Sequence, residues 1–313
     1  MTMTLTQILI FGGIIVDQYA LVDKSPDRGG DVLIADSFFR VGGCAVNVGS
    51  TLQNLGLNPH IVSSIGDDAW GQLIRSYLKE RQFSELAIRY VDNSKSGYCI
   101  SIIENDGERT FLTYKGCEAE FTPQMLEGIP FTQISHIYLT GYYLLQPEFT
   151  HVILKQLKKL KEAGAFLVFD PGPLVASIQK DTLHAVLELA DILIPNESEL
   201  DILERTMAWG YRDLSRYWEK GIAYVVLKKG SRGVQVWTED SSFSLDSFQV
   251  NSIDTTGAGD SFAAGLLYGL SQGYDMTTSA RIASACGAIT TTFMGPHGIF
   301  TYDSITEMIE KAR

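Results

Sequence analysis

Residues 251–270 read NSIDTTGAGDSFAAGLLYGL, a glycine-punctuated polar turn that runs into an apolar segment. Phe262, Leu266 and Leu270 recur every four residues, as on one face of a helix. A helix that begins near Asp260 leaves its first backbone N–H groups without acceptors, and its dipole favours an anion there. Gly257 and Gly259 let a ligand come close to those donors. The stretch therefore predicts a site for a phosphate-like anion.

Asp260 conflicts with this prediction if it only caps the helix, because its carboxylate would repel the anion that the turn attracts. The conflict is resolved if Asp260 is a base. It would then take a proton from a hydroxyl group that attacks the bound phosphate.

Three other motifs, of phosphate-binding loops or hydrolases, share residues with this stretch, but the chain lacks the rest of each motif. A dinucleotide fingerprint needs glycine where Phe262 stands, and a Walker A loop needs a Gly-Lys pair, which the chain lacks. The run from Gly259 to Phe262 is similar to the start of a GDSL-type hydrolase. That enzyme would need a later Asp-x-x-His pair, but Met294 stands three residues before His297, the last histidine.

The segment Asp254-Thr-Thr-Gly-Ala-Gly-Asp260 closely resembles the D-T-x-G-A-G-D signature of the ribokinase-like (pfkB) carbohydrate kinases. The resemblance implies that Asp260 is the catalytic base, with Gly257, Ala258 and Gly259 forming an anion hole. A second segment, Val41 to Asn47, matches the family pattern G-G-x-x-x-N. Here Gly42, Gly43 and Asn47 are implied to bind the substrate, and so is Asp17, at the end of a predicted strand.

Asn196-Glu-Ser-Glu199 resembles the N-x-x-E motif of the family. The resemblance implies that Glu199 helps to place Mg²⁺, usually through water, while Asn196 lies near the nucleotide. Mg²⁺ suits carboxylate, water and phosphate oxygen ligands. The same four letters could also form an ordinary helix cap.

Nucleotide contacts are implied for the turn from Lys228 to Gly233, with Gly230 and Gly233 approaching ATP through their backbones. Many relatives have Thr where Lys228 stands and Asn where Ser284 stands. Lys228 could reach a phosphate or point to water, and Ser284 leaves the contact with adenine open. Asp254 and the turn Gly295-Pro-His-Gly298 are similar to elements that hold a monovalent cation, such as K⁺, in several relatives.

Strand-like and helix-like segments alternate along the chain with short links, which predicts an α/β fold with a mostly parallel sheet and helices on both faces. Residues 7–15 are predicted to be the first core strand. We expect one ribokinase-like kinase domain over residues 1–313. Two β-rich segments, about 18–40 and 92–117, are expected to form a small inserted lid. Ligands should then bind beyond the carboxyl ends of the strands.

The second strand of the lid places Arg109 and Lys115 on one face, because side chains alternate along a strand. That face could meet an acidic or phosphorylated substrate, or it could be a solvated surface. In the resembled family such lids often pair, which implies a homodimer. Tyr142 and Tyr143, after another strand end, are further candidates for substrate selection.

The 313 residues include 25 Lys and Arg against 37 Asp and Glu, a formal net charge of −12 that argues against a nucleic-acid partner. The apolar run from Ile8 to Val16 is too short to span a bilayer, and no basic segment precedes it. The four scattered cysteines have no metal-like spacing and favour a reducing compartment. We therefore expect a cytoplasmic protein without a membrane partner.

These observations predict an ATP-dependent sugar kinase that phosphorylates a hydroxyl group, in particular a primary CH₂OH. Mg²⁺ is the expected cofactor. A nucleoside kinase and a sugar-phosphate kinase of the same family remain alternatives. The unusual Lys228 and Ser284 also leave open a catalytically weak regulator that binds a sugar or a nucleotide.

Overall fold

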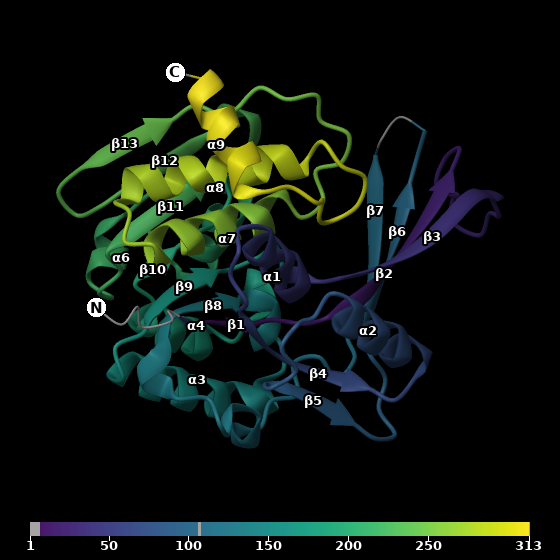
Figure 1. Cartoon of the computed structure of the whole chain (residues 1–313), viewed down its shortest axis with the longest axis horizontal. Coiled ribbons are helices and arrows are strands. Elements are labelled where there is room, and N and C mark those ends of the chain that lie inside the picture. Colours follow the sequence, from purple (N-terminus) through teal and green to yellow (C-terminus); the bar gives the residue numbers. More distant parts are fainter. Residues whose placement is uncertain (1–6, 106–107, 313) are drawn as a thin grey trace.

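The computed structural model describes residues 7–105 and 108–312, without the side chain of Arg109. Its largest element is a nine-stranded sheet that runs through the body of the molecule (Figure 1). The strand order is β13 (Ser242–Leu245), β12 (Val234–Trp237), β11 (Tyr224–Lys228), β10 (Ile192–Leu193), β9 (Phe166–Asp170), β8 (Ile134–Thr140), β1 (Gln7–Phe11), β4 (His60–Gly66) and β5 (Ile88–Val91). All neighbours from β11 to β5 pair in parallel, and β12 and β13 add an antiparallel edge.

Helices cover both faces of this sheet because the core strands are apolar on both sides. Leu9 and Phe11 of β1 belong to one hydrophobic cluster, and Ile8 and Ile10 belong to the other. The first cluster includes α3 (Pro147–Glu162), α4 (Lys180–Leu189) and α5 (Glu197–Met207). The second includes α1 (Cys44–Asn54), α2 (Ala69–Glu80), α7 (Ala258–Ser271) and α8 (Met276–Thr290). The predicted α/β architecture is confirmed.

The remaining helical segments are short or lie at the periphery. They are α6 (Ser215–Trp218), α9 (Tyr302–Lys311) and 3₁₀ turns at Pro123–Leu126, Phe131–Gln133, Gly141–Leu144, Val175–Ser177 and Gly230–Arg232.

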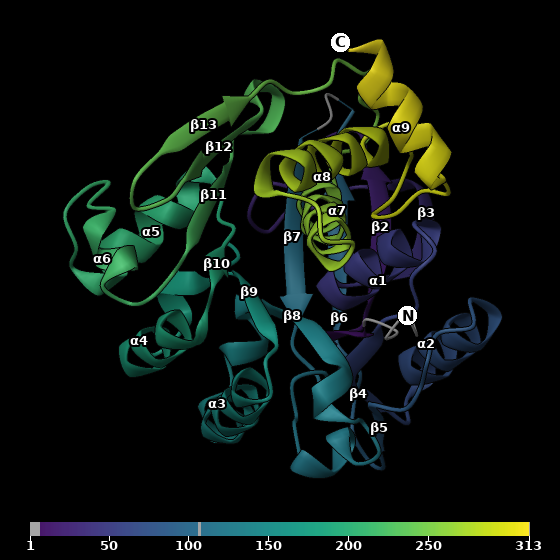
Figure 2. The same ribbon diagram turned by 60° about the vertical axis from the view of Figure 1, so that its left-hand side comes forward.

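A smaller four-stranded sheet projects from one side of the body in Figure 1, and in the turned view of Figure 2 its strands overlap with the body. Its order is β3 (Ile34–Gly42), β2 (Ile15–Val22), β6 (Tyr98–Ile103) and β7 (Arg109–Tyr114). β2 and β6 pair in parallel, whereas the two outer pairs are antiparallel. Trp70 of α2 lies between Phe39 and Tyr98 of this sheet, with ring centroids 5.1 and 6.3 Å away. We call this sheet the lid.

The predicted first strand, residues 7–15, ends early, and a second strand begins at its last residue. β1 ends at Phe11, and the chain passes through Gly12 and Gly13 before β2 begins at Ile15 in the lid. A Cβ atom on Gly13 would lie 2.6 Å from Cγ of Glu118, so the glycines allow other segments to pack against this bend. As a consequence, Asp17 belongs to the lid and not to the main sheet.

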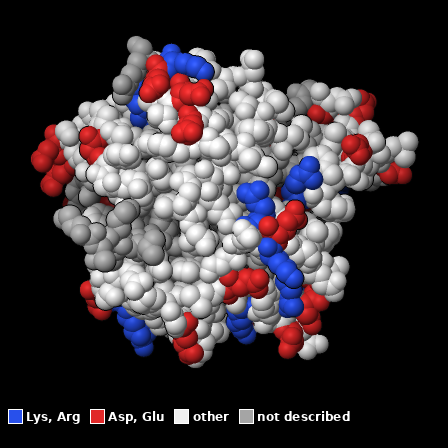
Figure 3. All heavy atoms as spheres, viewed as in Figure 1, with Lys and Arg blue, Asp and Glu red and all other residues white. Residues whose placement is uncertain are grey.

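The surface of the described residues carries both signs of charge. On the face drawn in Figure 3, basic and acidic side chains are interspersed. Within the ranges that the structure describes, no helix has the length and apolar character needed to cross a membrane.

Candidate active site

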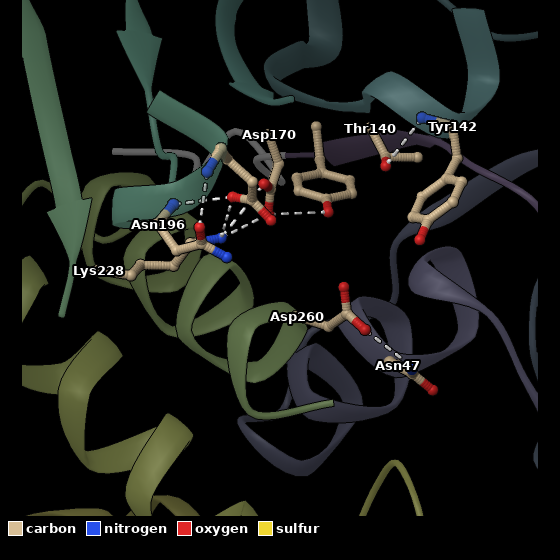
Figure 4. A network of polar contacts seen from close by, with 9 residues as sticks. Asn47, Thr140, Tyr142, Asp170, Asn196, Lys228 and Asp260 are labelled. Carbon is tan, nitrogen blue, oxygen red and sulfur yellow. Dashed lines mark hydrogen bonds and ion pairs between the residues drawn. The ribbon is translucent and has the colours of Figure 1, made fainter. Parts of the chain in front are cut away.

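Polar residues gather where four neighbouring strands of the main sheet end. Thr140 ends β8, Asp170 ends β9, Asn196 follows β10 and Lys228 ends β11 (Figure 4). Together with Asp260 they line a cavity of about 380 Å³. The carboxyl edge of a parallel sheet is where such folds bind ligands, as the sequence predicted.

The turn before α7 lies against this cavity. Gly257 caps the helix with φ of 75°, and a Cβ atom there would lie 1.9 Å from the Pro296 carbonyl oxygen. Gly259 and Asp260 are in the first turn, where the helix offers their N–H groups no acceptor. The N–H of Ala258 donates to the Thr255 carbonyl at 3.2 Å. Ala258 can therefore serve the predicted anion hole only by sharing or breaking that bond.

Asp260 points into the cavity from the first turn of α7 and meets Asn47 of α1 (Figure 4). The Asn47 side-chain amide donates to its carboxylate at 2.7 Å. Burial raises the pKa of Asp260 to about 6, and the negative Asp170 adds to the rise. The Asn47 hydrogen bond and the positive Lys228 oppose it. Above that pH Asp260 is an ionised base held beside an anion site.

Asp17 and Gly42 face each other on paired strands of the lid. A Cβ atom on Gly42 would lie 2.3 Å from Oδ2 of Asp17, so a side chain there would displace the carboxyl group. Burial, and to a smaller extent the charge of Asp260, raises the pKa of Asp17 to about 7. Gly43 follows as the cap of α1, with φ of 86°. Asp17 is thus close enough to Asp260 for the two carboxyl groups to interact electrostatically.

The amide oxygen of the Asn47 side chain is a second sign that a ligand binds here. Asn47 is 5% exposed, and its Oδ1 has no hydrogen-bond partner among the described residues. A buried amide oxygen without a donor is costly. A hydroxyl group of a bound ligand, other than one that donates to Asp260, would supply that donor.

The two cations predicted on the lid differ in position. Lys115 Nζ lies 3.4 Å from Oε1 of the buried Glu118 and 4.8 Å from the ring centre of Tyr142. Arg109 pairs with Ile103, four residues along β7 from Thr113, which belongs to the row of Asp17. Four residues of strand span about 13 Å. The backbone of Arg109 is therefore at the far end of the lid strand, and its side chain is outside the described part.

Asn196 and Glu199 form a reciprocal cap at the start of α5. The Asn196 N–H donates to Oε2 of Glu199 at 2.7 Å, and the Glu199 N–H donates to Oδ1 of Asn196 at 2.8 Å. The helix-cap alternative is thus present. Both residues also line the cavity, so the cap and a functional role are compatible. Burial raises the pKa of Glu199, and the charge of Lys228 opposes that rise.

Lys228 points inward instead of into solvent. Its ammonium donates to both carboxylate oxygens of Asp170, at 3.2 and 3.0 Å, and lies 4.0 Å from Oε2 of Glu199. The following turn holds Gly230 and Gly233 with φ of 57° and 84°. Lys228 and Gly230 line both cavities of this region.

A second cavity, of about 460 Å³, adjoins the first and is lined mainly by glycines, hydroxyl residues and apolar side chains. Gly233, Gly259 and Ser284 are on its wall. Ser284 donates its hydroxyl to the Ala280 carbonyl of its own helix at 2.9 Å. The hydroxyl proton is thus used within α8, so Ser284 can contact a base as a hydrogen-bond acceptor and can donate to it only by leaving that carbonyl.

Asp254 is buried beneath the anion turn at 1% exposure. Its carboxylate accepts from the N–H groups of Thr256 at 2.8 Å and Gly295 at 2.9 Å. It therefore connects the start of the turn with the segment 295–298. In that segment Nε2 of His297 lies 3.1 Å from the Val41 carbonyl of the lid.

Three residues of the site had no assigned role in the sequence. Asp170 ends β9, but its partner Lys228 is 58 residues away and no motif joins them. Cys44 lines the cavity from a variable position of the G-G-x-x-x-N pattern. Glu118 follows the lid and is 1% exposed. Of these three residues, only Asp170 carries a signal in the sequence, because it is an acidic residue at the end of an apolar, strand-like run.

Known proteins resemble this chain along nearly all of its length. A sugar kinase of Escherichia coli strain K12 named YegV, described as uncharacterized, is 28% identical over 287 residues, which are 90% of this chain and 87% of that protein. An ATP-dependent ribose-1-phosphate kinase of Halopiger xanaduensis is 28% identical over 307 residues, 98% of this chain and 99% of that protein.

Solved structures share the fold. The nucleoside kinase of Methanocaldococcus jannaschii, an archaeal member of the ribokinase family, superposes with a TM-score of 0.83 at 23% identity, covering 97% of this chain and 98% of that one. The sequence profile of the pfkB family carbohydrate kinases matches residues 5–298. The chain therefore belongs to the pfkB family of carbohydrate kinases, phosphotransferases that act on an alcohol group.

Proposed function

We propose that this protein transfers the γ-phosphoryl group of ATP to a hydroxyl group of a sugar or a sugar derivative, with Asp260 as the general base. The observation that carries the proposal is the placement of Asp260 in the first turn of α7. There its carboxylate adjoins the helix N–H groups and accepts from the side-chain amide of Asn47, whose Oδ1 is buried and without a partner among the described residues. A primary CH₂OH is the acceptor that reaches such a position with least steric hindrance.

The chain's own residues divide the work. Asp17 and Asn47 hold the acceptor, and Asp260 takes the proton of its hydroxyl group as the oxygen attacks the γ-phosphorus. The N–H groups at the start of α7 bind the charge of the phosphoryl group as ADP leaves. Gly230, Gly233 and Ser284, around the larger cavity, are the proposed nucleotide contacts, together with Asn196 and Lys228.

The acidic residues at the strand ends fit Mg²⁺. Among the described residues no group of three or more acidic, histidine or cysteine ligands gathers. Glu199 and Asp170 would thus leave most ligand positions to water and phosphate oxygens, as this ion prefers. When bound, Mg²⁺ would neutralise phosphate charge. Asp254 orients the turn before α7 through Gly295, so K⁺ bound at this carboxylate would stabilise the same turn.

The decisive experiment is a screen of ATP consumption over neutral sugars, sugar acids, sugar phosphates and nucleosides. It is run with Mg²⁺ and with K⁺ present or absent. We expect ATP to be consumed with a hydroxyl-rich acceptor and ADP to appear in equal amount with the phosphorylated product. If no acceptor of the panel supports consumption, the catalytically weak regulator becomes the better description.

A sugar-phosphate kinase and a nucleoside kinase remain competing proposals, because a ribose-1-phosphate kinase and a nucleoside kinase resemble the chain. A phosphorylated acceptor needs a cation near Asp17. Lys115 is already paired with Glu118, whereas Arg40 lies opposite Asp17 on β3 and is a second candidate. Activity confined to sugar phosphates would assign this role to Arg40 and leave the kinase itself intact.

A further inference from the structure

Lys228 is the one cationic side chain among the described residues that line the two cavities. Its ammonium bonds to both oxygens of Asp170, at 3.2 and 3.0 Å, and lies 4.0 Å from Glu199 (Figure 4). A Cβ atom on Gly259 would be 3.6 Å from this nitrogen. The ammonium thus stands where the two cavities meet, beside the anion turn.

The three charges do not balance. The side chains of Lys228, Asp170 and Glu199 are 14%, 8% and 8% exposed, and they carry one positive and two negative charges when ionised. Charge that is withdrawn from water needs a partner. The group therefore accepts one more positive charge readily, and any anion that binds at the turn is within reach of the same ammonium.

Binding of a metal–nucleotide pair would reassign these partners without leaving a charge unpaired. The phosphates bring negative charge to the ammonium, and the metal brings positive charge to the carboxylates. A flexible lysine with its four-carbon stem can follow the phosphates, whereas the carboxylates are fixed at a strand end and a helix cap.

We propose that the Lys228 ammonium is a resident counter-ion of Asp170 and Glu199, which it exchanges for a divalent cation when it moves to the nucleotide phosphates. Asp170 is then a positioning residue of the phosphoryl-transfer site. The proposal rests on the proposed function, because it assumes that this site binds a metal–nucleotide pair. The alternative is a static ion pair that only joins β9 to β11.

The exchange and the static ion pair predict different changes in Mn²⁺ affinity for Lys228→Met. Binding of Mn²⁺ to the nucleotide-free protein is titrated by the electron paramagnetic resonance signal of the free ion. Exchange predicts that Lys228→Met binds Mn²⁺ about tenfold more tightly or better, because no ammonium competes at 3 to 4 Å from the carboxylates. It also predicts that Asp170→Asn binds Mn²⁺ more weakly, since a ligand is lost while Lys228 remains.

A static ion pair predicts that both variants loosen the same site and change Mn²⁺ affinity in the same direction. Unchanged or weaker Mn²⁺ binding by Lys228→Met overturns the proposal. Lys161→Met is the matched control, because Lys161 pairs with Asp191 and lines neither cavity. Its Mn²⁺ affinity should equal that of the unmodified protein.

A second titration tests whether Lys228 moves to the nucleotide phosphates. With the metal chelated by EDTA, Lys228→Met should bind ADP at least about tenfold more weakly, since a charged phosphate contact is lost. Equal ADP affinity overturns the proposed move to the phosphates. Should Lys228→Met not fold, as judged by thermal unfolding, Lys228→Thr serves in both titrations. Neither readout depends on kinase turnover, so a failed acceptor screen and a failed exchange are separate results.

Discussion

Asp260 owes its chemistry to its neighbours. Burial disfavours its charge, while the amide of Asn47 and the ammonium of Lys228 favour it. The result is a carboxylate that is basic enough to accept a proton from an alcohol as the phosphoryl bond forms, yet still ionised at neutral pH. The residue-scale tests therefore remove the carboxylate or titrate it.

Asp260→Asn should lower kcat by about 10²–10⁴-fold, the usual size of a general-base effect, with nearly unchanged KM for acceptor and ATP. Steady-state kinetics and a thermal melt check this. The matched control is Asp275→Asn, because Asp275 caps α8 through the Thr278 N–H and asparagine caps equally well. A turnover of Asp260→Asn within tenfold of the unmodified enzyme removes this residue from the mechanism.

The decrease of kcat/KM at acidic pH should report the protonation of Asp260. Because the pKa of Asp260 is raised to about 6, the base is protonated below that pH, and kcat/KM should fall as the pH drops through 6. Asp17, with a pKa raised to about 7, is the competing source of such a limb. Asp17→Asn should weaken acceptor binding and retain the limb, whereas the residual activity of Asp260→Asn should lack it. The reverse pattern would assign the base to Asp17.

At the scale of elements, the turn before α7 is the part with the least freedom. Gly257 combines φ of 75° with a wall formed by the Pro296 carbonyl. Any side chain there must displace the segment that also touches Asp254 and the lid. The geometry of the anion hole is thus supported by a second turn far along the chain.

Gly257→Ala should lower kcat at least about 10²-fold and cost more stability than the ~1 kcal/mol typical of Gly→Ala at positive φ, because the clash adds to the backbone strain. Gly56→Ala is the control: φ there is 85°, and nothing lies within 4 Å of the added Cβ atom. The two variants are compared by denaturant unfolding and by kcat. If both variants lose the same stability and keep a normal kcat, the segment around Pro296 moves aside for the added methyl group, which contradicts the prediction.

Periodic elements were predicted well and breaks were not. The helices around Leu52 and Leu266 follow from the spacing of apolar residues, which burial on one side imposes. In the run from residue 7 to 15 the glycine pair Gly12-Gly13 marks a break, but nothing in the pattern tells that the chain enters another sheet after it. The packing of Glu118 against Gly13 joins residues more than a hundred positions apart and has no local signal.

At the scale of the whole molecule, the lid exposes apolar side chains that its own sheet does not cover. Leu33 is 91% exposed, Ile34 and Leu112 are 55% exposed and Phe111 is 52% exposed. Phe111 and Leu112 lie on the edge strand β7, and an exposed apolar edge of a sheet is a surface on which a second chain can pack. We propose that two lids pair in a homodimer, as the sequence led us to expect.

Leu112→Asp should shift the protein from dimer to monomer, because a charge would be buried in the paired lids. Light scattering coupled to size-exclusion chromatography measures this over a range of concentrations. Ile299→Asp is the control, since Ile299 is 76% exposed and lies outside the lid. A monomer before any substitution, or a dimer that survives Leu112→Asp, contradicts pairing through this strand.

The site was predictable where a motif is local and not where it is assembled by the fold. Asp260 and Asn47 stand in recognisable segments, and the structure brings them to 2.7 Å. The bond between Lys228 and Asp170 joins residues 58 positions apart and depends on the order of β9, β10 and β11. Likewise, the pairing of Lys115 with Glu118 became visible only when both side chains had positions.

The break between β1 and β2 has a consequence for how this enzyme can diversify. It places Asp17, one of the two residues proposed to hold the acceptor, on the lid, while Asn47, Asp260 and the turn before α7 stay in the body. With these proposed roles, part of the acceptor site lies on a piece of the fold that is separable from the proposed site of phosphate transfer. A chimera that receives β2, β3, β6 and β7 from a relative should adopt the donor's acceptor preference at the recipient's catalytic rate.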